Sequence, residues 1–233
     1  MTQNLSSFRR AGLALIFLVA VDLQSASATM VFDDHFTGNS GGIPANWTGQ
    51  GTIVESGTTV TLHGFAYMGT TQTFDPQGGT LTVTAEIVGT NYRAHAGIVD
   101  PATRLNQFEF KITVPDGSVD VHVKDGDSGE QEYLAGYLSE YTGGPIRLTA
   151  VLTATTFTIS TDSPPFSTGP VDYAAAFPTF TRADLGNATA LLVVCEALDG
   201  IPTFTTYDRI TATVDQPTAV ERNTLGQIKA RYR

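Results

Sequence analysis

The sequence predicts an all-β protein, an antiparallel sandwich of two sheets with a short C-terminal helix. Two observations across the 233 residues predict it. Many short segments alternate apolar and polar side chains, which is the period of a strand with one buried face. Turns rich in glycine and proline separate these segments, and no segment before residue 215 has the longer period of a helix. We therefore expect one sandwich domain over residues 29–215.

The strand pattern is clearest in seven segments, which are residues 81–87, 108–114, 119–124, 146–152, 156–160, 191–197 and 203–214. A turn at Pro115-Asp116-Gly117-Ser118 joins the second segment to the third, because proline fixes the bend and glycine tolerates positive φ. The fourth and fifth segments form another hairpin. The sixth is almost wholly apolar, which predicts a central strand covered on both faces.

Composition excludes several classes of protein. Hydrophobic residues make up 41% of the chain and charged residues 15%, so it can bury a core and is not broadly disordered. A net charge of −10 repels phosphate backbones, so no nucleic-acid partner is expected. Cys195 is the only cysteine, which rules out an internal disulfide. Its apolar setting predicts a small buried side chain and not a reactive thiol.

Residues 1–28 have the three parts of a secretory signal peptide in the required order. Arg9 and Arg10 supply positive charge, residues 11–21 are apolar, and Ala26-Ser27-Ala28 fits the cleavage pattern. The apolar stretch is too short to cross a bilayer as a helix, and no other stretch approaches that length. We expect cleavage after Ala28, a mature chain without a transmembrane segment, and a secreted or cell-surface location. The alternative is a short buried helix of the mature fold.

Residues 216–233 form a linker and a short basic amphipathic helical tail. Thr218 and Glu221 fit a capping box. The apolar residues of this tail share one helical face, and they are Val220, Leu225, Ile228 and Tyr232. One interpretation is an appended helix that docks on the sandwich or frays. The other is a sorting or attachment tag.

Both ends of the sandwich region resemble a known family. Val31-Phe32-Asp33-Asp34-His35-Phe36, a Gly-rich stretch and then Ile43-Pro44-Ala45-Asn46-Trp47 resemble the opening of concanavalin A-like domains. Tyr207-Asp208-Arg209-Ile210-Thr211-Ala212-Thr213-Val214 resembles their final strand. The resemblance to this lectin/glucanase (laminin-G-like) superfamily implies a jelly roll with one curved, grooved sheet and adjacent first and last strands. Lectins, carbohydrate-binding modules and family-16 glycoside hydrolases share this fold, so it does not fix an activity.

The catalytic motif of the family-16 hydrolases is absent. Those enzymes carry a Glu-x-Asp-x-Glu or Glu-x-Asp-x-x-Glu strand, whose two glutamates act as nucleophile and acid/base. Here Glu130 and Glu132 have no aspartate between them, and Glu109 and Glu196 belong to no such motif. We therefore expect no catalytic residue from this motif, although carboxylates from distant strands can still meet.

The resemblance also implies a structural calcium ion where the first and last strands meet. By analogy its ligands are Asp34 and Asp208, with Asp33 beside them, because calcium takes carboxylate and carbonyl oxygens. The alternative is that these acids form turns or pair with Arg209.

Carbohydrate binding needs exposed aromatic rings beside polar groups. The candidates are Trp47, Tyr92, Tyr133, Tyr137 and Tyr141. Each can instead pack in the core, where most aromatic rings lie. A zinc site is not expected, because the four histidines lie far apart in the sequence, at His35, His63, His95 and His122.

Three functions remain open at this stage. The first is an exported, non-catalytic module that binds a glycan or another cell-surface polymer. The second is a structural or surface-associated sandwich positioned by its C-terminal tail. The third is a glycan hydrolase or lyase with an unusual pair of acids. A glycan array separates the first from the second, because the second predicts binding to no polysaccharide.

If calcium joins the terminal strands, chelation lowers the melting temperature, because an ion that binds only the folded state stabilises it. Thermal denaturation followed by circular dichroism, with EDTA and then with excess calcium, measures this effect. An unchanged melting temperature would contradict the calcium prediction.

Overall fold

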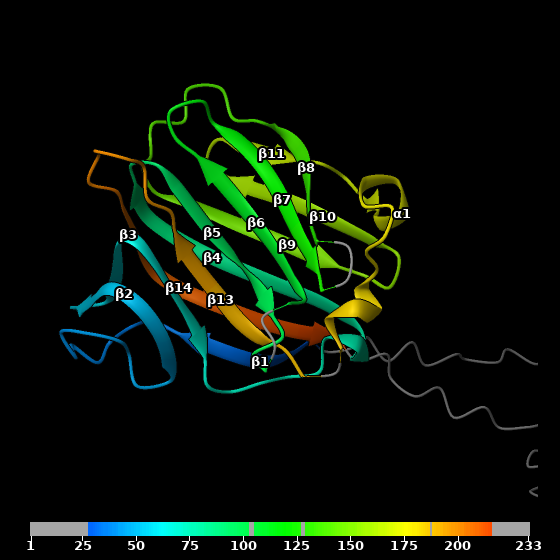
Figure 1. Ribbon diagram of the computed structural model, residues 1–233, viewed down its shortest axis with the longest axis horizontal. Coiled ribbons are helices and arrows are strands. Elements are labelled where there is room, and N and C mark those ends of the chain that lie inside the picture. Colours follow the sequence, from blue (N-terminus) through cyan, green and yellow to red (C-terminus); the bar gives the residue numbers. More distant parts are fainter. Residues whose placement is uncertain (1–27, 103–104, 127–128, 187, 216–233) are drawn as a thin grey trace, which may run out of the picture.

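The computed structural model describes residues 28–102, 105–126, 129–186 and 188–215 (Figure 1). Residues 1–27 of the expected signal peptide and the whole C-terminal tail lie outside the described residues. Within them the chain forms an all-β sandwich of two antiparallel layers, as the sequence predicts. No helix in this described part is long and apolar enough to span a membrane.

The front layer in Figure 1 is the sheet that carries the candidate site. Its strands, in the order in which they pair, are β2 (Trp47–Ser56), β3 (Thr59–Thr70), β13 (Ala190–Cys195), β5 (Arg93–Val99), β6 (Gln107–Thr113), β7 (Ser118–Asp125) and β8 (Gly129–Tyr137).

The rear layer packs behind this sheet. Its strands are β1 (Ala28–Asp34), β14 (Phe204–Asp215), β4 (Thr80–Thr90), β9 (Ile146–Leu152), β10 (Thr156–Asp162) and β11 (Pro165–Ser167) in pairing order, with β12 (Val171–Asp172) also paired to β10. The first and last strands are adjacent, since Asp33 pairs with Thr211 and Asp34 with Ile210.

Strand β14 connects the two layers. Residues 204–207 pair with β3 of the front layer, residues 210–215 pair with β1, and β4 lies along the other side of the strand. The register with β4 shifts on both sides of Tyr207, where the strand passes from one layer to the other. The hydrogen-bonded ladder is therefore continuous, and the sandwich is one sheet that curls over itself.

Strict alternation of side chains separates the core from the outer face of the front layer. In β6, Phe108, Phe110 and Ile112 are fully buried in the core, so the intervening Glu109 and Lys111 project to the opposite face. One part of the core between the layers is an aromatic cluster, in which the centroids of contacting rings lie 5.5 to 6.4 Å apart. Its members are Phe108, Tyr133, Phe157, Tyr173, Phe177 and Phe180.

All seven expected strand segments are strands in the structure. The apolar segment at residues 191–197 was expected to be covered on both faces, and the structure differs from this in one respect. Leu191, Val193 and Cys195 face the core, but Ala190, Leu192 and Val194 face outward and are covered only by side chains of their own sheet.

Three single-turn helices lie within the sandwich domain, where the sequence shows no helical period. They are η1 (Pro76–Gly78), α1 (Tyr173–Ala176) and η2 (Arg182–Leu185). Each begins after a capping residue, namely Asp75, Asp172 and Thr181. A single turn contains too few residues to show a periodic pattern.

We predict that Phe157→Ala lowers the free energy of unfolding by about 3–5 kcal/mol, because it leaves a cavity in the aromatic cluster. Urea denaturation followed by tryptophan fluorescence measures the change. Phe65→Ala is the matched control, because that ring is 64% exposed and its loss changes stability by less than about 0.5 kcal/mol. Equal losses in the two variants would contradict this description of the core.

Candidate functional site

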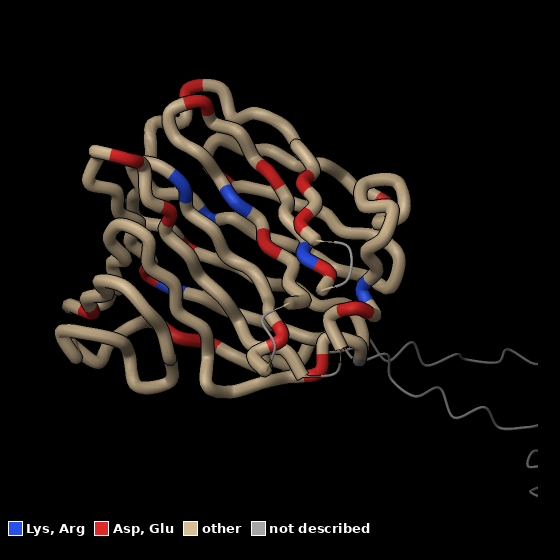
Figure 2. Tube along the Cα trace, viewed as in Figure 1, with Lys and Arg blue, Asp and Glu red and all other residues tan. Residues whose placement is uncertain are grey.

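The outward face of the front layer holds a groove of about 520 Å³, which we call the trough. Its apolar side includes Phe65, Tyr67, Val99, Leu192 and Val194. Its polar side includes His95, Gln107, Glu109, His122, Glu130 and Glu196. Apart from Glu196, which directly follows β13, these residues come from β3, β13, β5, β6, β7 and β8, and alternation turns them away from the core. Acidic and basic positions are interspersed over the strands of the front layer (Figure 2).

Two aromatic rings mark the apolar side of the trough. Phe65 and Tyr67 lie two residues apart on β3 and therefore share a face, with ring centroids 6.3 Å apart at an interplanar angle of 66°. Phe65 is largely exposed, and the Tyr67 hydroxyl donates a hydrogen bond to Gln50 Oε1 at 3.0 Å. Leu192 and Val194 of β13 form the apolar floor beside them.

Strand register brings the polar side chains together from distant parts of the sequence. His95 lies opposite Lys111 in the β5–β6 pair, and Glu109 lies opposite His122 in the β6–β7 pair. Glu132 lies opposite His122 in the β7–β8 pair. The two imidazole rings come within 6.2 Å of each other, measured between centroids.

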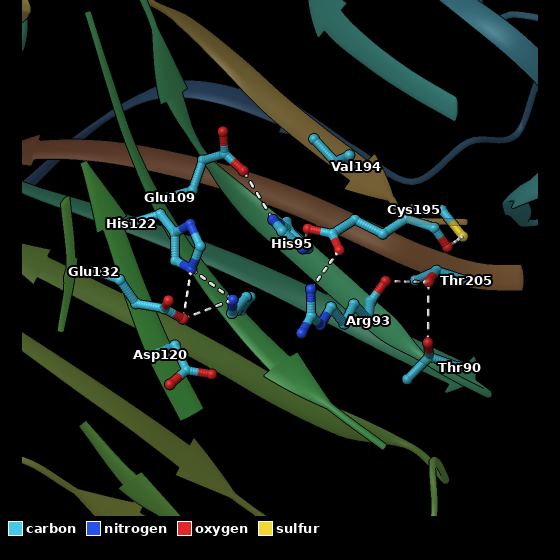
Figure 3. A network of polar contacts seen from close by, with 12 residues as sticks. Thr90, Arg93, His95, Glu109, Asp120, His122, Glu132, Val194, Cys195 and Thr205 are labelled. Carbon is cyan, nitrogen blue, oxygen red and sulfur yellow. Dashed lines mark hydrogen bonds and ion pairs between the residues drawn. The ribbon is translucent and has the colours of Figure 1, made fainter. Parts of the chain in front are cut away.

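His95 is the centre of the polar network (Figure 3). Its Nδ1 lies 2.9 Å from Glu109 Oε2, and its Nε2 lies 2.9 Å from Glu196 Oε1 as an ion-pair contact. The other oxygen of Glu196 accepts a hydrogen bond from Arg93 Nη1 at 2.7 Å. Burial lowers the pKa of His95, but its contacts with Glu109 and Glu196 raise it by more, so the pKa lies above its ordinary value. The two glutamates therefore favour the protonated form of the ring.

Glu196 is correspondingly held as a carboxylate. The contact with His95 and the Arg93 guanidinium lower its pKa from 4.5 to about 2, although partial burial acts in the opposite direction.

A second group of contacts surrounds His122. Its Nδ1 lies 2.8 Å from Glu130 Oε1, and its Nε2 contacts both the Lys111 ammonium and Glu132 Oε1. Lys111 also donates to Glu132 at 2.9 Å. This hydrogen bond lowers the pKa of Glu132, against the effect of partial burial. Lys111 and His122 therefore each contact at least one glutamate.

Asp120 differs from the other carboxyl groups of the network. It lies on β7, where it is buried opposite Lys111 of β6, and it accepts a hydrogen bond from Ser118 Oγ at 3.0 Å. Burial raises its pKa, against the effects of Ser118 and Lys111. It does not line the trough.

The acids expected at a calcium site lie on the rear layer, away from the trough. Asp33 pairs with Arg209 through two contacts of 2.8 Å, which is the alternative considered above. Asp34 accepts hydrogen bonds from the backbone N–H of Phe36 and from Trp47 Nε1, each at 2.8 Å. Asp208 lines a separate hollow with Glu86, Arg147 and Asp162. Among the described residues, no group of three or more His, Cys, Asp or Glu side chains is placed to hold a metal ion.

None of the five aromatic residues singled out in the sequence lines the trough. Trp47 and Tyr141 are buried in the core. Tyr133 packs against Phe157 and Phe177, and the Tyr92 ring lies 5.0 Å from the Arg93 guanidinium. Tyr137 is exposed at the end of β8. Phe65 and Tyr67 take the place in the trough that these residues were expected to fill.

We predict that Glu196→Gln flattens the pH dependence of stability at both ends. A carboxyl group with a lowered pKa stabilises the fold above pH 4.5 and loses that contribution as pH falls toward 2. His95 has a raised pKa, so its contribution is complete below 6.5 and is lost as pH rises through the pKa of the folded state. Glu196→Gln removes the acidic part of this dependence and reduces the alkaline part.

Urea denaturation over a series of pH values measures both changes. Glu86→Gln is the control, because Glu86 pairs with Arg147 on the rear layer and does not contact the network. A pH profile of Glu196→Gln that is parallel to that of the unmodified protein would refute the assigned charges.

No family model matches the chain, and no curated protein matches it. Solved structures do match. β-Agarase A from Zobellia galactanivorans has a TM-score of 0.60 at 12% identity, over 81% of this chain and 92% of that one. The non-specific endo-β-1,3(4)-glucanase SCLam, from family GH16, has a TM-score of 0.57 at 10% identity, over 81% and 91%. The catalytic domain of an endo-1,3-β-glucanase (laminarinase) from Thermotoga petrophila RKU-1 has a TM-score of 0.56 at 10% identity, over 82% and 100%.

Identities this low establish a shared architecture and leave the chemistry of the trough to be argued from its own residues. The architecture is the one that the two ends of the sandwich region imply. The chain is a jelly roll with the concanavalin A-like fold.

Proposed function

We propose that the protein is an exported, non-catalytic module that binds a glycan in the trough. The observation that carries this proposal is the pair of the exposed Phe65 ring and the half-buried Tyr67 ring beside hydrogen-bonding side chains. Sugar rings have apolar faces that stack on aromatic rings, and their hydroxyl groups pair with polar side chains. An extended groove on the outside of a sheet leaves room for more than one sugar residue.

The pKa shifts and positions of the carboxyl groups favour binding over hydrolysis. A glycosidase needs one carboxylic acid with a raised pKa to protonate the leaving group, and a second carboxylate as nucleophile or base. In the trough, Glu196 has a pKa of about 2, and His95 lies between it and Glu109. Asp120 has a raised pKa, but it lies outside the trough lining. The carboxyl group with the raised pKa and the one with the lowered pKa therefore do not line the trough together, which supports binding over hydrolysis.

Export is the part of the proposal that depends on residues 1–28. A calcium ion at the terminal strands stays a prediction. Neither is required for the trough to bind a sugar chain, because Phe65, Tyr67 and the lining residues of the trough lie on the front layer, away from the acids of the predicted calcium site.

We predict that Phe65→Ala weakens glycan binding by about tenfold or more, because a lost stacking ring is worth on the order of 1–2 kcal/mol. Affinity electrophoresis against β-1,3-glucan, agarose, chitin and chitosan identifies the ligand, and titration calorimetry with its oligosaccharides measures the change. Tyr137→Ala is the comparison, since that ring is equally exposed but lies outside the trough. Binding lost in Tyr137→Ala and kept in Phe65→Ala would place the ligand elsewhere.

The same samples test the non-catalytic part of the proposal. Incubation with the bound polysaccharide is expected to release no reducing ends above the level of a heat-denatured sample. Release that Glu109→Gln or Glu196→Gln abolishes would make the protein a hydrolase with an acid pair drawn from different strands.

A further inference from the structure

We propose that the trough selects against acidic glycans and takes a glycan that carries free amino groups. This inference rests on the proposed function and names the class of ligand for the same site. It is argued from the charged groups that line the trough, because these include more acidic residues relative to basic ones than the polar network as a whole.

The residues that line the trough include more acidic than basic side chains. Three glutamates line it, Glu109, Glu130 and Glu196, and none of its described lining residues is a lysine or an arginine. The two lining histidines already have acidic partners: His95 contacts both Glu109 and Glu196, and the Nδ1 of His122 contacts Glu130. Lys124 follows His122 on the same face of β7 but does not line the trough.

Around Glu130 and Glu132 the basic groups are the more deeply placed partners. The side chains of Lys111 and His122 are 3% and 13% exposed, whereas those of Glu132 and Glu130 are 53% and 61% exposed. Arg93 and Glu196 differ less, at 34% and 26%. A ligand that approaches the Glu130 end of the trough from solvent therefore meets carboxylate oxygens first and finds the basic groups beneath them. A carboxylate binds one proton donor through one oxygen and keeps lone pairs for another.

This arrangement discriminates between glycans by charge. An ammonium group of an amino sugar pairs with the exposed carboxylates and donates up to three hydrogen bonds. A uronate or sulfate group meets like charges, which disfavours binding. A neutral sugar chain gains hydrogen bonds without the ionic contribution. The net charge of −10 adds a long-range attraction for a cationic chain.

The test compares three probes by titration calorimetry at about pH 6, above the ordinary pKa of carboxyl groups. The probes are a glucosamine hexamer, the N-acetylglucosamine hexamer with the same backbone and linkage, and an oligogalacturonate of equal length. We expect the glucosamine hexamer to bind on the order of tenfold more tightly than its acetylated counterpart, with the gap narrowing as salt rises. We expect no measurable binding of the oligogalacturonate.

Two variants assign the preference to the trough. Glu130→Gln removes the most exposed lining carboxylate and is expected to weaken binding of the glucosamine hexamer about two- to fivefold more than binding of the acetylated hexamer. Glu86→Gln removes the same charge from the rear layer and is the matched control. Equal effects of the two variants would assign any preference to overall charge and overturn the proposal.

The result also separates this inference from the proposed function. A protein that binds a neutral or acidic glycan as tightly as the glucosamine hexamer, and loses that binding in Phe65→Ala, has the proposed function with a different ligand class. A protein that binds no glycan of any charge has neither.

Discussion

The trough depends on how strand β14 holds the two layers together. Tyr207 is fully buried where this strand passes between the layers, and its hydroxyl donates to the backbone carbonyl oxygens of His95 and Val194, at 2.7 and 3.1 Å. These carbonyls belong to β5 and β13, the two strands that carry the centre of the polar network and the apolar floor. A buried hydroxyl without a partner costs about 1–3 kcal/mol, so this contact fixes the spacing of the two strands from behind.

The polar network costs stability as well as contributing it. Lys111 and His95 are almost fully removed from water, which is unfavourable for charged groups unless each finds close partners. Both find them, so the side chains of the polar network have few alternative positions. A network fixed in this way can present hydrogen-bonding groups to a ligand without first becoming ordered, which lowers the entropic cost of binding. Apolar side chains at the same positions would give a stable sheet that lacks these groups.

Much of the fold could be predicted from the sequence, because alternation is a local signal. The segments over residues 81–87 and 108–114 show it within seven residues, and both are strands. The site could not be predicted in this way. His95, Glu109, His122 and Glu196 are visible individually, but strand pairing between distant segments decides which of them meet. The available signal was the set of polar residues alternating with buried ones on β6 and β7, which marks them as one face. The aromatic candidates did not mark the trough for a related reason, since tertiary packing decides that Trp47 is buried and Phe65 is exposed.

The position of β14 in the sheet order has a consequence for how the protein folds. This strand is formed by residues 204–215, yet its neighbours are β1, β3 and β4 from the first ninety residues. The hydroxyl groups of Thr61 and Thr206, 3.0 Å apart, come from positions separated by 145 residues. The chain loses conformational entropy when loops of this length close, and this loss comes before the contacts of β14 can stabilise the fold. We therefore expect slow, late assembly, with little native structure before the last strand joins. A chain truncated before residue 204 would leave β1, β3 and β4 without this partner, and their unpaired edges favour aggregation over a smaller folded domain.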